Sequence, residues 1–74
     1  MKYAMYRTMS KDRKNHVILG HDDIEDTYHV SCKLYGKYYR WEYTTYNHAC
    51  YKFNIIHKEF LRIFSDSILT NLKY

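Results

Sequence analysis

The 74-residue sequence contains no proline and only two glycines, Gly20 and Gly36. A glycine-rich phosphate-binding loop is therefore excluded, because such a loop needs several residues without a side chain. No hydrophobic run approaches the ~20 residues of a membrane span. The first residues alternate between polar and apolar, so we expect no signal peptide. These absences predict a protein of the cytoplasm.

The cysteines are also few. Cys32 and Cys50 cannot build a disulfide framework, and in a chain without an export signal we expect reduced thiols, with a Cys32–Cys50 disulfide as the alternative. His48 stands two residues before Cys50, but no second pair of ligands at zinc-site spacing accompanies them. The sequence therefore predicts neither a metal nor a cofactor.

Catalytic groups are equally sparse. A nucleophilic enzyme needs a cysteine or serine held against a histidine and an orienting acid. Cys32 is expected in the core, where a thiol is usually inert. A chain of this length buries only about 60% of its unfolded surface, which leaves no room for an enclosed active-site chamber. We expect a protein that binds without catalysing a reaction.

The centre of the sequence predicts a β-hairpin over residues 28–45. Gly36-Lys37 suits the central positions of a type II′ turn, whose first residue needs a positive φ. With this turn, Lys33 would face Arg40. A slip by one residue would mix polar and apolar side chains on each face, so the alternation supports the pairing. One face is then apolar, and the other is basic and rich in tyrosine.

The segment before this hairpin predicts a second one. Alternating polarity indicates a strand over residues 3–9 that pairs with a short strand over residues 16–19. A polar connector over residues 10–15 joins the two strands. We expect the acidic stretch 21–26 to be a loop or a single helical turn.

After Tyr46 the hydrophobic period lengthens from two to about 3.6 residues, which predicts a helix capped by Asn47. The apolar arc of this helix comprises Ala49, Cys50, Phe53, Ile56, Phe60, Leu61 and Phe64. The pattern loses its phase at residues 65–67, where we expect a break and then a short final helix through about Lys73. A strand over Tyr51–Ile56 is the weaker alternative.

Together these elements predict one α+β domain over residues 1–74, in which a small antiparallel β-sheet of three to four strands packs against a C-terminal α-helix. We expect the core to comprise Val30, Leu34, Trp41, Phe53, Ile56, Phe60 and Phe64. The helix would cover the apolar face of the central hairpin and leave the polar face exposed.

That polar face is the candidate binding surface. Its candidate residues carry a positive charge or a phenol ring: Lys33, Tyr35, Lys37, Tyr38 and Arg40, with Arg7 and Arg13 from the N-terminal part. Lysine and arginine contact phosphates, and tyrosine rings stack on unpaired bases. Tyrosine and arginine are also enriched at protein interfaces. A solvated sheet face without a partner is the third interpretation.

The composition adds a hypothesis about origin. The formal net charge of +4 permits a nucleic-acid or acidic-protein partner. Tyr, Lys, Ile and Asn are frequent, and their codons are typical of the A/T-rich genomes of phages and mobile elements. We interpret the chain as a non-catalytic phage or mobile-element accessory factor that inhibits a host nucleic-acid-processing or defence complex by protein–protein contact. The alternative is direct binding of RNA or single-stranded DNA. A homodimer through an open sheet edge is a further possibility.

Overall fold

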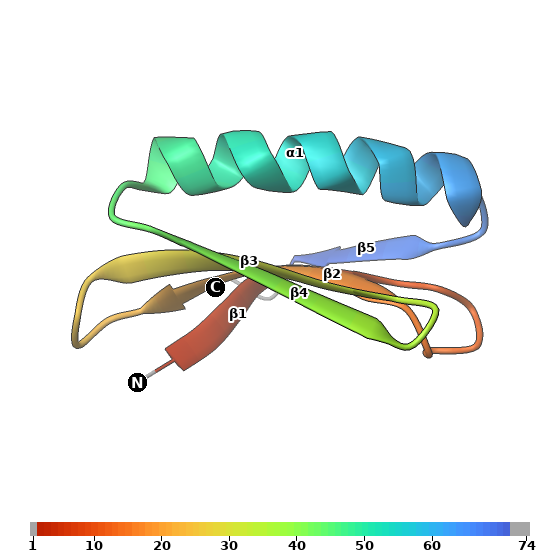
Figure 1. The fold of residues 1–74 in the computed structure, drawn as a ribbon, viewed down its shortest axis with the longest axis horizontal. Coiled ribbons are helices and arrows are strands. Elements are labelled where there is room, and N and C mark those ends of the chain that lie inside the picture. Colours follow the sequence, from red (N-terminus) through yellow and green to blue (C-terminus); the bar gives the residue numbers. More distant parts are fainter. Residues whose placement is uncertain (1, 72–74) are drawn as a thin grey trace.

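An antiparallel sheet with the strand order β4-β3-β2-β1-β5 lies beneath a single helix, α1 (Figure 1). The computed structural model describes residues 2–71. The elements are β1 (Lys2–Met9), β2 (His16–Asp22), β3 (Thr27–Leu34), β4 (Lys37–Tyr43), α1 (Tyr46–Ile63) and β5 (Ile68–Asn71). The predicted α+β fold, a small antiparallel sheet packed against a C-terminal helix, is confirmed.

The core lies between α1 and the two strands at the centre of the sheet. Val17 and Leu19 of β2 and Val30 and Cys32 of β3 are buried there, because alternate residues of a strand point to the same face. From the helix, Ala49, Phe53 and Phe60 pack against them. Of the predicted core, Val30, Phe53 and Phe60 are buried, whereas Leu34, Trp41, Ile56 and Phe64 are half-buried at its margin.

The central hairpin forms, but its turn is not the predicted one. Leu34 pairs with Lys37, so the turn residues are Tyr35 and Gly36. Both have positive φ, 51° and 83°, which is the requirement of a type I′ turn. Lys33 consequently faces Tyr38. The predicted pairing was therefore wrong by two residues on one strand. Because a shift of two residues keeps every side chain on its face of the sheet, the predicted faces are correct.

The side chain of Asn15 explains the position of this turn. Its Oδ1 accepts a hydrogen bond of 2.9 Å from the backbone N–H of Tyr35, twenty residues away in the sequence. Its Nδ2 donates to Ser10 Oγ at 3.3 Å, and Ser10 Oγ in turn donates to Asp12 Oδ1 at 2.6 Å. The connector between β1 and β2 is therefore ordered by side-chain hydrogen bonds, and it holds Tyr35 in the left-handed conformation.

Two further boundaries differ from the prediction. The helix begins two residues earlier, because Thr45, and not Asn47, is its N-cap and accepts from the His48 N–H at 3.4 Å. Strand β2 continues past the predicted end to Asp22, whose Oδ1 accepts from the Ile24 N–H at 3.1 Å and so closes the acidic turn.

The predicted final helix is wrong. The chain reverses direction after α1, where Ser67 Oγ donates to the Phe64 carbonyl oxygen at 2.6 Å. It then forms β5, which pairs with the Tyr6–Met9 part of β1. The free edge of β1 offers backbone partners to this segment, whereas so short a helix would be marginal by itself. The part of the prediction that falls on residues 72–73 lies outside the described residues. None of the described helical structure has the length and apolar character that crossing a membrane requires.

We expect Asn15→Ala to destabilise the fold by about 1–3 kcal/mol, because it removes the side-chain acceptor of the Tyr35 N–H and the amide that donates to the Ser10 hydroxyl. Urea denaturation followed by circular dichroism measures this change. Tyr35→Asn is the matched control at the other end of the bond. It keeps the N–H and suits positive φ, so it should be neutral or stabilising. A loss equal to that of Asn15→Ala would contradict this explanation of the turn.

Candidate binding surface on the open face of the sheet

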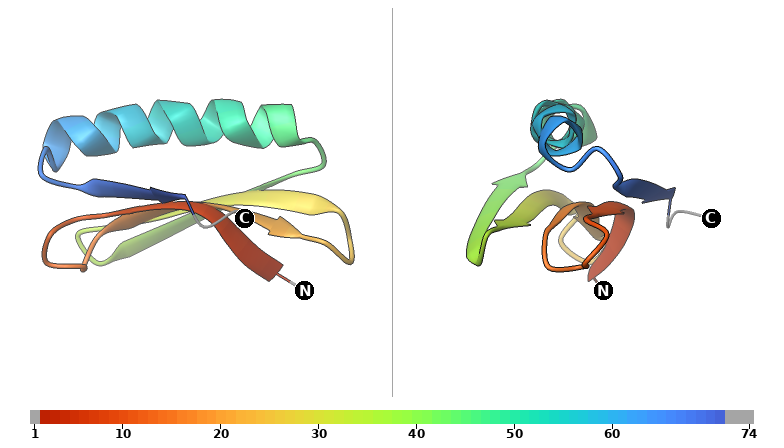
Figure 2. Two further views of the ribbon diagram at one scale, coloured as in Figure 1. Left: turned by 180° about the vertical axis from the view of Figure 1, so that it is seen from behind. Right: turned by 90° about the vertical axis from the view of Figure 1, so that its right-hand side faces the viewer.

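The face of the sheet opposite α1 is not covered by any described element (Figure 2, right). We call it the open face. Because all pairings are antiparallel and their registers are fixed, its side chains fall into rows that run across β4, β3, β2 and β1. The first row is Tyr38, Lys33, His16 and Met9; the second is Arg40, Ser31, Ile18 and Arg7; the third is Glu42, His29, Gly20 and Ala4.

Four of the predicted site residues share the open face. Lys33 of β3 and Tyr38 and Arg40 of β4 are exposed, and Arg7 of β1 is half-buried. Lys33 and Arg40 stand in adjacent rows on neighbouring strands, and Arg7 lies in the same row as Arg40. The Nε of Arg7 is buried and has no hydrogen-bond partner among the described residues. The structure therefore gathers the cations of three strands on one surface.

The other predicted residues lie elsewhere. Tyr35 is in the turn, and its ring is 5.8 Å from that of Phe64, which places it towards the helix side. Lys37 pairs with Leu34, so its position in the strand falls on the side of the sheet that faces the helix. Arg13 lies in the connector, exposed, with a positive φ of 63°. The hydrogen bond from the Tyr35 N–H to Asn15 and the pairing of His16 with Lys33 bring this connector beside the hairpin tip.

Two histidines belong to the surface and were not predicted. Burial, together with the charges of Lys33 and Arg7, lowers the pKa of His16 below its ordinary 6.5. Burial and the charges of Arg40 and Lys2 likewise lower the pKa of His29. Their place could not be predicted from sequence, because it depends on how β2 pairs with β3. Burial is the main cause for both imidazoles, and for His29 the carboxylates of Glu42 and Asp22 act against the nearby cations.

The His29 ring occupies the space next to Gly20 on the neighbouring strand. A Cβ built on Gly20 would overlap the Cε1 and Nε2 atoms of His29. The absence of a side chain at position 20 thus lets the imidazole lie flat on the sheet, an arrangement in which a ring covers a glycine of the adjacent strand.

Glu42 places an acidic side chain beside the cations. Arg40 Nη2 donates to Glu42 Oε1 at 3.0 Å on the same face of β4. This hydrogen bond raises the pKa of Arg40, so the guanidinium stays charged. Because the pair is exposed to solvent, it contributes little to stability. Its effect is to orient Arg40 along the edge of the sheet.

The two cysteines differ in their burial. Both thiols are free, and Cys32 is buried. Burial raises the pKa of the Cys32 thiol, which disfavours the nucleophilic thiolate. Within residues 2–71, no three side chains of His, Cys, Asp or Glu approach closely enough to hold a metal ion.

Comparison with known proteins adds no functional information. The chain matches no protein-family model, no curated protein and no solved structure. The function must therefore be argued from the surface itself.

The lowered histidine pKa values predict that stability falls in mild acid. In the folded chain burial lowers the pKa of His16, His29 and His57, whereas in the unfolded chain these imidazoles titrate near 6.5. The unfolded state then binds more protons as the pH drops below that value, so the free energy of unfolding decreases from about pH 7.5 to about pH 5.5. Urea titrations at the two pH values measure the effect.

His57→Phe is the informative variant for this prediction. The His57 ring stacks on Phe53 with centroids 5.2 Å apart, and its Nε2 is buried without a described partner. A phenyl ring keeps the stacking and cannot bind a proton, so the variant should lose less stability in acid. Stability that increased between neutral and mildly acidic pH would contradict the analysis.

Proposed function

We propose that this chain is a non-catalytic binding protein whose open face holds single-stranded nucleic acid, RNA or DNA. The observation that carries the proposal is the gathering of Arg7, Lys33 and Arg40 from three strands in two adjacent rows. An uncovered sheet with cations for the backbone and an aromatic ring for a base is a recurring platform for unpaired nucleotides.

Each group on the platform has a physical task. Lys33 and Arg7 neutralise phosphates and release counterions, which favours binding at low salt. Tyr38 is 58% exposed and offers its ring to a base. The lowered pKa values of His16 and His29 favour the uncharged imidazoles, which add no repulsion between cations.

A protein partner is the second candidate, and the Arg40–Glu42 pair favours it. A carboxylate beside the cations opposes a polyanion, but it suits a partner of mixed charge. In that case the chain would act as a phage or mobile-element factor in the host cytoplasm, where it would block a nucleic-acid-processing or defence complex. Failure to bind any oligonucleotide at low salt would favour this candidate.

Salt dependence tests the primary proposal. Fluorescence anisotropy with a labelled single-stranded oligonucleotide should show affinity that falls steeply with salt. Lys33→Ala and Arg7→Ala should each weaken binding and reduce the slope of log K against log salt by about 0.7, the value for one phosphate contact on a single strand. Oligonucleotides of RNA and DNA with the same sequence compare the two backbones.

The matched control is Lys58→Ala, which removes the same charge from an exposed position on α1. Because Lys58 lies on the helix layer and not on the open face, its removal should leave the slope unchanged. Equal effects of Lys58→Ala and Lys33→Ala would show that only net charge matters, and the open face would then have no special role.

A further inference from the structure

Strand β4 forms an open edge of the sheet whose free backbone groups can be assigned. In a two-residue hairpin the pair next to the turn, here Leu34 and Lys37, exchanges both backbone hydrogen bonds. Farther from the turn, pairs without hydrogen bonds alternate with hydrogen-bonded pairs. Along β4, the residues that turn N–H and C=O groups away from β3 are therefore Tyr38, Arg40 and Glu42. A strand added at this edge must bond to these three residues.

These three residues limit how two copies of β4 can pair about a two-fold axis. Outward-facing residues alternate along the strand. They can therefore form hydrogen bonds with one another only if the two-fold axis passes through a residue, and not between two residues. An axis at Arg40 or at Glu42 sets two like charges directly opposite, which is unfavourable. An axis at Tyr38 leaves Arg40 opposite the turn residue Gly36, and an axis at Tyr39 leaves Glu42 opposite it. An axis at Trp41 sets Arg40 of each copy opposite Glu42 of the other.

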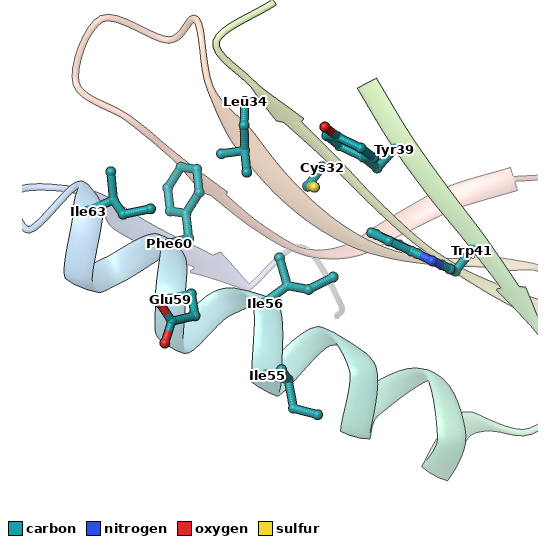
Figure 3. A pocket seen from close by; sticks show the side chains of 9 residues that line it. All are labelled: Cys32, Leu34, Tyr39, Trp41, Ile55, Ile56, Glu59, Phe60 and Ile63. Carbon is teal, nitrogen blue, oxygen red and sulfur yellow. The ribbon is translucent and has the colours of Figure 1, made fainter. Parts of the chain in front are cut away.

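The helix-facing side of β4 favours the same arrangement. In antiparallel pairing about Trp41, the two Trp41 side chains meet in a pair without hydrogen bonds, where side chains approach most closely, and Tyr39 faces Tyr43. Tyr39 and Trp41 already stack within one chain, with centroids 6.2 Å apart. Both line a groove of about 350 Å³ between β4 and α1, opposite Ile56 and Phe60 (Figure 3).

We propose that the protein forms a homodimer by antiparallel pairing of β4 with β4 of a second copy, with the two-fold axis at Trp41. A second copy fits this edge because the charges of the edge are self-complementary. Arg40 of each chain lies opposite Glu42 of the other, which gives two Arg40–Glu42 pairs between the chains. The dimer joins the two sheets into one and brings the apolar grooves together on the helix side. The open faces remain accessible, so the inference does not rest on the proposed function.

Charge reversal tests the pairing without nucleic acid. By light scattering after size exclusion, we expect the wild-type protein to have twice the 9.2 kDa mass of the chain. Arg40→Glu sets carboxylates against carboxylates, and Glu42→Arg sets guanidinium groups against one another. Each change should raise the dissociation constant at least about tenfold. Both positions are exposed, so circular dichroism should show an intact fold.

The decisive step is to mix these two variants. Pairing about Trp41 sets every acidic side chain of one variant opposite a basic side chain of the other, so a heterodimer should form from two proteins that fail to dimerise alone. The double variant R40E/E42R should dimerise as the wild type does. A wild-type monomer at every concentration, single variants that remain dimers, or a mixture that stays monomeric would each overturn the proposal.

A disulfide test reports the register directly. Residues paired without hydrogen bonds have Cα atoms about 4.5 Å apart, within reach of a disulfide. Trp41→Cys should therefore crosslink two chains under mild oxidation. Tyr39→Cys is the control, because each position 39 faces position 43 of the other copy. The wild-type chain corrects for Cys50. Crosslinking of Tyr39→Cys alone would contradict the register.

Discussion

The sheet is wider than the single helix that covers it, and the accessible surfaces of the structure depend on this difference in width. Strands lie about 4.8 Å apart, so a five-stranded sheet is roughly twice as wide as the ~10 Å diameter of a helix with its side chains. α1 therefore shields the middle of one face, where Val17, Leu19, Val30 and Cys32 are buried. Trp41, further out on β4, is only half-buried, and the opposite face has no described cover. The two surfaces proposed for binding follow from this partial coverage.

The two proposed surfaces use the same strand in different ways. On β4, Arg40 and Tyr38 contribute side chains to the open face, while the backbone of the same residues forms the free edge. The dimer engages the backbone of β4 and the Arg40–Glu42 pairs, whereas Tyr38 and Lys33 point out of the sheet and stay accessible on the open face. A dimer would extend the open face across the two-fold axis, so that one nucleic-acid strand could contact both copies.

Alternation in the sequence was sufficient to predict which side chains share a face of the central hairpin, and the helical period was sufficient to predict the helix and most of its buried side. The position of the turn was not predictable, since it depends on Asn15, a residue of another loop. Strand β5 was missed because its partner, the edge of β1, exists only in the folded chain. Arg7, Lys33 and Arg40 were predicted as candidates from their charge. The two histidines beside them were missed, because their place depends on strand pairing that exists only in the folded chain.

Nuclear magnetic resonance of the histidine side chains tests the central claim most directly. The pKa values of His16 and His29 are lowered partly by the cations of the open face, whereas that of His57, on the helix side, is lowered by burial alone. A single-stranded oligonucleotide bound to the open face should therefore raise the pKa of His16 and His29 and leave that of His57 unchanged. With the oligonucleotide at saturating concentration, unchanged values at His16 and His29, or a shift confined to His57, would contradict the account.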